Sequence, residues 1–183
     1  MSTAVITERI AEASPSFKAG MAGVLYLLSV GTAVVGESFV RGSLAIAVGL
    51  IAVAGMIAVT LLFYDIVRPV SQNLAWFAAS FSLAGLTLEA LRWSPHGVDI
   101  AMVLHGLYCV LIGYLVFRSA FLPRLLGALM ALGGLGWLTF LSPALGTYVS
   151  PYNLACGFIG EGSAMLWLLV MGANVQRWRE EAR

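Results

Sequence analysis

Six apolar segments, each about 20 residues long, follow one another along this 183-residue chain. An α-helix rises 1.5 Å per residue, so about 20 residues are needed to cross the roughly 30 Å hydrocarbon layer of a membrane. Short polar or Pro- and Gly-containing stretches separate the segments and leave no room for a further domain. The predicted spans are residues 20–37, 42–64, 74–92, 99–117, 125–145 and 154–174.

This pattern predicts an all-α, polytopic membrane protein with a single bundle of six transmembrane helices. We expect a polar N-terminal tail at 1–18, the six-helix domain at 19–175 and a C-terminal tail at 176–183. Only 10% of the residues are charged, whereas a soluble domain has about 25%. So few charges cannot cover a surface that faces water, and they form no basic patch for nucleic acid. The expected partners are membrane lipids and an apolar small molecule. The sequence indicates no oligomeric state.

The basic residues fall mainly on one side of the predicted spans. Of the ten Lys and Arg residues, only Arg41 and Arg92 lie on the side away from the two termini. Cytoplasmic loops carry the excess of positive charge in membrane proteins. We therefore expect both termini in the cytoplasm and a multi-pass location in the cell membrane.

Ionisable side chains inside membrane spans are costly and usually face the bundle interior. With the predicted orientation, five of them fall in the outer half of the membrane, namely Glu37, Glu89, Asp99, His105 and Glu161. Asp65 lies on the inner side, where we expect an ion pair with Arg68. The segregation of the other five indicates one polar zone where a site would lie.

His105 and Glu161 are the deepest members of this zone. His105 shares a helical face with Met102, Cys109 and Ile112. Glu161 lies between Gly160 and Gly162, and glycines beside a buried carboxylate permit a close neighbouring backbone, a local break in the helix or room for a ligand. Three interpretations stay open: a structural hydrogen bond between spans four and six, a functional acid–base pair or proton relay, and a metal site.

The metal interpretation is the weakest of the three on sequence grounds. One histidine with carboxylates lacks the usual three or four zinc ligands at recognised spacing. Cys109 and Cys156 lie in apolar runs typical of packed, unreactive cysteines, and His96 is expected in a solvated loop. Phosphate-binding glycine loops and nucleophile elbows are absent from the sequence. We expect neither a metal nor a cofactor.

The remaining candidates are side chains that would complete a pocket around the acid–base pair. Glu37 would supply a second carboxylate. Arg41 either pairs with Glu37 or recognises an anionic group of a lipid or metabolite. Tyr108, Trp137 and Trp167 either pack in the bundle or line an apolar substrate pocket.

Several short motifs resemble a bacterial integral-membrane family, domain-of-unknown-function family 4386. They include Ala22-Gly23-Val24-Leu25-Tyr26, Glu37-Ser38-Phe39-Val40-Arg41, His105-Gly106-Leu107, the run from Gly113-Tyr114-Leu115 to Arg118-Ser119-Ala120-Phe121-Leu122-Pro123-Arg124, and Gly160-Glu161. The resemblance implies a six-helix membrane fold in a bacterial membrane. It also places Glu37, His105, Arg118 and Glu161 at motif positions. No general activity is assigned to the family.

Three functions are compatible with these features. The first is a membrane-embedded enzyme of the isomerase, cyclase or hydrolase type, acting on an apolar small molecule or lipid with Glu161 as acid or base and His105 as its partner. The second is a small proton-coupled transporter. The third is a non-catalytic scaffold or subunit in which the polar cluster serves packing alone.

Overall fold

The computed structural model describes residues 14–93 and 98–183, and all regular structure in these ranges is helical. His96 and most of the predicted N-terminal tail lie outside the described residues. The elements are α2 (Pro15–Phe39), α3 (Ser43–Val67), α4 (Gln72–Ala90), α5 (Ile100–Arg118), α6 (Arg124–Leu138), the 3₁₀ turn η2 (Thr139–Leu141), α7 (Pro143–Tyr148), α8 (Tyr152–Val170) and α9 (Val175–Glu181).

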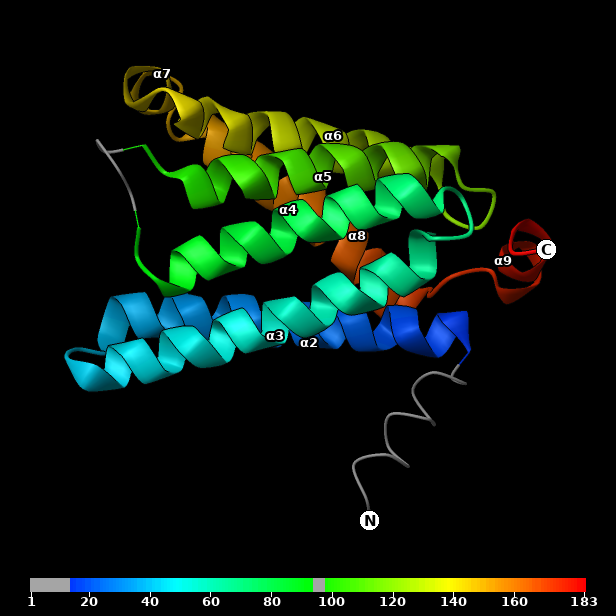
Figure 1. Ribbon diagram of the computed structural model, residues 1–183, viewed down its shortest axis with the longest axis horizontal. Coiled ribbons are helices and arrows are strands. Elements are labelled where there is room, and N and C mark those ends of the chain that lie inside the picture. Colours follow the sequence, from blue (N-terminus) through cyan, green and yellow to red (C-terminus); the bar gives the residue numbers. More distant parts are fainter. Residues whose placement is uncertain (1–13, 94–97) are drawn as a thin grey trace, which may run out of the picture.

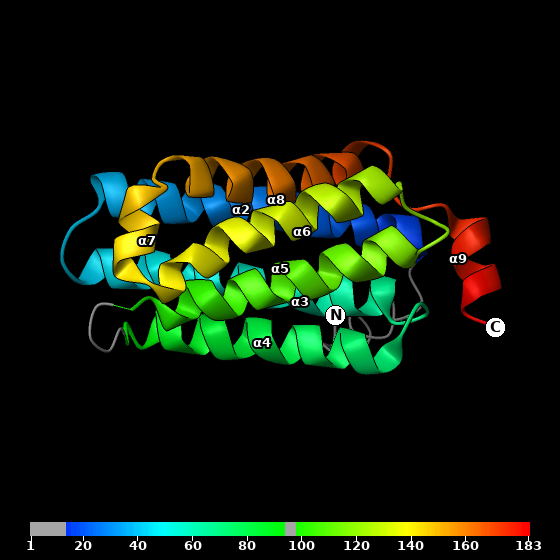
Figure 2. The same ribbon diagram turned by 90° about the horizontal axis from the view of Figure 1, so that it is seen from above.

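The six helices with 15 to 25 residues form a closed ring. Each helix packs against the next in the chain, from α2 to α6; α6 then packs on α8, and α8 returns to α2. Figures 1 and 2 show these helices running alongside one another, with α7 at one end of the bundle and α9 at the other. We call these the α7 end and the α9 end. Side chains from all six helices can therefore meet at the centre.

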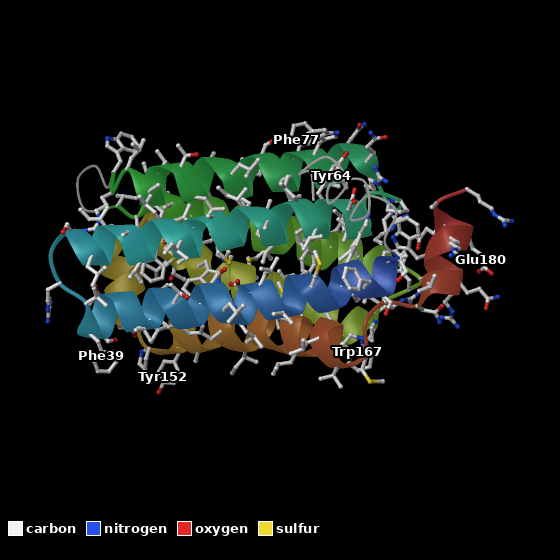
Figure 3. The ribbon with its side chains drawn as sticks, turned by 90° about the horizontal axis from the view of Figure 1, so that it is seen from below. Phe39, Tyr64, Phe77, Tyr152, Trp167 and Glu180 are labelled. Atoms are coloured by element: carbon white, nitrogen blue, oxygen red, sulfur yellow. The ribbon has the colours of Figure 1, made fainter. Side chains whose placement is uncertain are left out.

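Five of the described helices are long and apolar enough to cross a membrane: Pro15–Gly36, Ser43–Val67, Ile100–Arg118, Arg124–Leu141 and Tyr152–Val170. This is the pattern of a multi-pass membrane protein. The bundle also carries large apolar side chains on its outside, including Leu28, Ile51, Phe77, Leu125 and Ile159, each more than 60% exposed. Phe77 projects away from the helices in Figure 3. Lipid tails rather than water suit such a surface.

The helix α4 is not among the five, although six spans are predicted from the sequence. It packs between α3 and α5 along the bundle, but Gln72 and Asn73 at its start and Glu89 near its end lower its mean hydropathy. The sixth span and the cytoplasmic position of the termini stay predictions.

The predicted fifth span, residues 125–145, does not form one helix. α6 ends at Leu138, η2 follows, and Ser142 begins α7 by accepting a hydrogen bond from the Leu145 N–H at 3.4 Å. Pro143 explains the break, because proline has no N–H and its ring collides with the carbonyl of the fourth residue before it. Asn153 fixes the corner by donating to the Thr139 hydroxyl at 2.9 Å.

The N-terminal helix starts earlier than predicted, so residues 15–18 of the expected tail are helical. Ser14 caps α2 by accepting from the Phe17 N–H at 3.3 Å, and Pro15 occupies the first turn. This start buries Lys18, whose ammonium lies 2.6 Å from Asp65 at the end of α3. The predicted pair of Asp65 with Arg68 is confirmed at 3.5 Å.

Candidate functional site

Glu161 lies at the middle of α8 and is only 3% exposed. Because α8 begins at Tyr152 rather than at residue 154, Glu161 is deeper than the outer-half position expected from the sequence. It is about 14 Å from the start of its helix, at 1.5 Å per residue. A carboxylate buried at this depth needs hydrogen-bond partners, because an unsatisfied charge is costly away from bulk water.

Three other helices supply those partners. Trp137 of α6 donates its indole N–H to Glu161 Oε1 at 2.5 Å, and Tyr26 of α2 donates its hydroxyl to Oε2 at 3.2 Å. The Nε2 atom of His105, on α5, lies 3.0 Å from Oε2 and 3.1 Å from Oε1. An ionised carboxylate only accepts hydrogen bonds, so Nε2 carries the proton that faces it.

Glycines set the distances between these helices. A Cβ atom at Gly23 would lie 2.9 Å from both the Met165 carbonyl oxygen and Leu169 Cβ, so α2 and α8 approach closely one turn from Tyr26. A Cβ atom at Gly157 would collide with the indole ring of Trp137. The helix α8 continues unbroken through Glu161. The sequence leaves three roles open for the glycines near Glu161. At Gly157 the glycine permits the close approach of a neighbouring group, the Trp137 ring.

Cys109 lies one turn after His105 on the same face of α5. Its Sγ atom is 3.6 Å from His105 Nε2, and the residue is fully buried. Asp99 fixes the start of this helix by accepting from the Met102 N–H at 3.1 Å. The register of α5 therefore presents an imidazole and a thiol together to Glu161.

A cavity of about 330 Å³ lies at the centre of the ring and is partly open. Four polar side chains, Tyr26, His105, Trp137 and Glu161, form its floor. Its walls are mainly apolar and come from α2, α3, α4, α5 and α8, for example Val30, Met56, Leu86, Met102 and Phe158. Glu89 and Asp99 line it toward the α7 end. The cavity is thus mainly apolar, with polar groups at its floor and again toward the α7 end.

A second cavity of about 440 Å³ lies between α2, α3 and the end of α4. It shares Ala33, Ala52, Val53 and Glu89 with the central cavity, so the two are neighbours along the same side of the ring. Arg92 is a further lining residue.

The predicted site residues divide into two groups. The structure brings together Glu161, His105 and Trp137, and it places the Tyr108 ring 5.8 Å from the His105 ring. Arg41 is exposed in the connection between α2 and α3 and lines neither of the two cavities above. The side chain of Glu37 lies outside the described part of the structure.

Trp167 is not part of the site. It lines a separate cavity near the α9 end, as its position in Figure 3 illustrates. Trp167 does not line the central cavity, because six residues of helical rise, about 9 Å, separate it from Glu161.

Two residues of the cluster, Tyr26 and Cys109, are not expected from the sequence. Tyr26 stands in an apolar run that reads as an ordinary span, and Cys109 reads as a packed cysteine. The spacing of His105 and Cys109 by four residues is a usable signal for Cys109. For Tyr26 the available signal is a phenol with a polar hydroxyl in the middle of a span, since a buried hydroxyl needs a partner.

The arrangement can hold and move a proton. His105 Nε2 faces the carboxylate, while Nδ1 has no hydrogen-bond partner among the described residues and the side chain is 19% exposed. A carboxylate that fixes one imidazole nitrogen leaves the other available as an acceptor, as in acid–base pairs of enzymes generally. His105 is also one of the residues that line the cavity.

Comparison with known proteins shows a similarity to one family but no activity. The model of a domain of unknown function, DUF4386, matches residues 84–172, which confirms the resemblance stated above for that part of the chain. An uncharacterized protein of Archaeoglobus fulgidus is 28% identical over an alignment of 130 residues that covers 65% of this chain and 78% of the relative. No solved structure matches. The family match contains His105, Cys109, Trp137 and Glu161, and Tyr26 lies before it.

Proposed function

We propose that this chain, whose residues 84–172 match the domain of unknown function DUF4386, is a membrane-embedded enzyme acting on an apolar small molecule or lipid. The reaction is a proton transfer of the isomerase, cyclase or hydrolase type. One observation carries the proposal: the buried Glu161 carboxylate contacts His105 at the floor of an apolar cavity. Because a fold does not determine a function, the reaction is inferred from the residues of the site.

The roles follow from the contacts. His105 takes a proton from the substrate, or returns one to it, through Nδ1. Glu161 orients the imidazole through Nε2 and stabilises its charged form. Trp137 and Tyr26 hold the carboxylate in place by their hydrogen bonds. The apolar walls bind the body of the substrate and exclude water from the reacting atoms.

The cavity favours this function over a scaffold. A polar cluster that served packing alone would be enclosed by side chains, because interiors are packed to high density. Here the cluster borders about 330 Å³ of space, which is within the size range of small-molecule sites.

The core beyond the site favours an enzyme over a transporter. Toward the α9 end, the residues one and two turns after Glu161 on α8 are Met165 and Leu168, exposed by 1% and 2%. Ile112 and Phe63, from α5 and α3, are equally buried. A transport path would need polar or water-accessible groups in this region. Among the described residues, packed apolar side chains fill the interior between the site and the α9 end.

The test is to purify the protein in mild detergent and identify co-purified lipids and metabolites by mass spectrometry. Wild type, Glu161→Gln and His105→Ala are compared with Glu180→Gln, a matched change in the exposed helix α9. We expect a discrete species in wild type and Glu180→Gln, and a different isomer or precursor, or loss of the species, in the two site variants. Size-exclusion chromatography confirms that each variant is folded.

Two outcomes would contradict the proposal. In one, folded wild type carries only bulk lipid and lacks a discrete species. In the other, both folded site variants carry the same species as wild type, in the same amount and chemical form.

A further inference from the structure

Cys109 belongs to the cluster at Glu161 but has no part in the proton transfer proposed above. We propose that His105 Nε2, Cys109 Sγ and one oxygen of Glu161 bind a divalent transition-metal ion, with Zn²⁺ as the best match. The candidate ligand atoms of these three residues all lie within 4.8 Å of one another. The role of the ion rests on the proposed function, whereas its binding is measured separately.

The distances suit a tetrahedral ion. Zn–N bonds of about 2.05 Å and Zn–S bonds of about 2.3 Å, at the tetrahedral angle, place the two ligand atoms about 3.6 Å apart. Nε2 and Sγ are 3.6 Å apart in the structure, and Nε2 is 3.0 to 3.1 Å from the carboxylate oxygens. The sequence argues against a metal because it offers one histidine with carboxylates. The thiol of Cys109 completes a set of three ligands of the kinds that zinc prefers.

The charges also balance. A thiolate and a carboxylate together neutralise a divalent cation, so the occupied cluster has no net charge in an apolar interior where an unpaired charge is costly. Binding releases the thiol proton of Cys109 to water, and the imidazole proton moves from Nε2 to Nδ1. Thus one proton leaves for each ion bound.

The groups around the ligands support an ion at this position. Tyr26 and Trp137 donate to the Glu161 carboxylate, as outer partners of metal ligands do. The hydroxyl of Tyr108 is buried and has no hydrogen-bond partner among the described residues, although it interacts electrostatically with Cys109 and Glu161. A buried hydroxyl without a partner is unfavourable. A water bound to the ion would accept a hydrogen bond from it.

Three protein ligands leave a fourth position, which is the arrangement of catalytic zinc sites. His105 and Glu161 line the central cavity, whereas Cys109 is fully buried. The fourth position therefore faces the cavity. A water bound there would replace His105 as the group that exchanges a proton with the substrate, because a metal ion makes its bound water more acidic.

Cobalt substitution tests the proposal on the intact protein in detergent. Chelator-washed wild type is titrated with Co²⁺, and its near-ultraviolet absorption is recorded for the band that arises when a thiolate binds Co²⁺. We expect a saturable band at one Co²⁺ per chain that disappears on addition of Zn²⁺. Cys109→Ser should lose the band and weaken binding by more than the 10- to 100-fold typical of losing an outer partner.

Cys156→Ser is the matched control, because this free cysteine on α8 is exposed and lies outside the cluster. It should keep the band unchanged. Folded wild type that binds no Co²⁺, or binds it without a thiolate band, overturns the metal site even if the variants do not fold. A band that survives in Cys109→Ser and disappears in Cys156→Ser overturns it as well.

The two proposals can fail separately. Metal-free wild type is analysed for bound species alongside Glu161→Gln. A discrete species that depends on Glu161, together with no cobalt band, supports the enzyme and overturns the metal site. A cobalt band with only bulk lipid in every preparation supports the metal site and overturns the enzyme.

Discussion

At the scale of residues, a single buried carboxylate connects several helices of the bundle. Glu161 accepts from Tyr26 and Trp137 and contacts His105, so its hydrogen bonds connect α8 to α2, α5 and α6. Hydrogen bonds to a charged acceptor are stronger than those between neutral groups. Their loss leaves part of a buried charge unsatisfied. The same contacts that orient the site therefore contribute to the stability of the fold.

The indole N–H of Trp137 tests this link. Trp137→Phe keeps an aromatic ring but removes the donor to Glu161, and we expect it to lower the free energy of unfolding by about 1–3 kcal/mol. Unfolding in detergent, followed by circular dichroism, measures the change. Trp167→Phe is the control, since Trp167 lies outside the cluster. Equal effects of the two substitutions would contradict the role given to the Trp137 hydrogen bond.

At the scale of elements, glycines determine how closely the helices approach. The α8 helix contains both a crowded and an open position. A Cβ atom at Gly157 would collide with Trp137, whereas one at Gly162 would have no other atom within 4 Å apart from its own helix backbone. Alanine substitutions at the two positions therefore measure the effect of packing and the effect of helix propensity separately within one helix.

We expect Gly157→Ala to destabilise the bundle and Gly162→Ala to be neutral or stabilising by up to about 1 kcal/mol, because alanine favours helix over glycine. The overlap at Gly157 must push the Trp137 ring away from Glu161, at a cost of about 1–3 kcal/mol. Unfolding titrations of both variants give the comparison, and tryptophan fluorescence reports the displaced ring. The prediction fails if Gly157→Ala is as stable as Gly162→Ala.

The helices α2 and α3 are connected by an ion pair as well as by packing. Lys18 is 7% exposed and contacts Asp65, whose side chain is 29% exposed. Asp65→Asn removes the carboxylate next to a buried ammonium. We expect a loss of about 1–3 kcal/mol, less than for a fully buried pair because water reaches Asp65. Arg68→Gln, which alters the exposed partner at 3.5 Å, should cost less than about 1 kcal/mol. Unfolding at low and high salt distinguishes the two, and a larger loss for Arg68→Gln would refute this assignment.

At the scale of the whole molecule, the ring has a definite polarity. Among the described basic residues, Arg41 and Arg92 lie at the α7 end, and the others lie toward the α9 end. The central cavity extends toward the α7 end, where Glu89 and Asp99 line it. If the α9 end faces the cytoplasm, as the distribution of charge predicts, the candidate site opens away from the cytoplasm.

Cysteine labelling tests both this orientation and the span α4. In a Cys109→Ala, Cys156→Ala background, Ser71→Cys and Arg92→Cys place single thiols just before and just after α4. We expect a membrane-impermeant maleimide added to intact cells to label the Arg92→Cys position alone. Labelling of both thiols from one side would show that α4 does not cross the membrane. Labelling of Ser71→Cys alone would reverse the orientation.

The helical architecture was predictable because lipid requires backbone polar groups to bond within each span, so apolar length alone indicates helices. The sequence singles out Glu161 and His105 as the deepest ionisable residues, since each needs a partner in a membrane span, but it leaves open whether they touch each other. The place of Cys109 beside His105 follows from their spacing on one helix, whereas the position of Tyr26 could not be derived in the same way. It depends on how α2 rotates about its axis, which is set by close packing at glycines such as Gly23. The same limit applies to Trp167. An aromatic residue inside a span can face either of two cavities, and the sequence does not indicate which one.

The central cavity has a consequence for how its occupant would be measured. Because the cavity is largely apolar and lies within a bundle whose outer surface is apolar too, an apolar occupant would partition between water, bilayer and protein. The concentration that governs occupancy is then the amount per lipid, not the amount per volume of water. An apparent dissociation constant should therefore rise in proportion as lipid or detergent is added at fixed total ligand. Affinities for this protein become comparable between preparations only when expressed as mole fractions in the membrane phase.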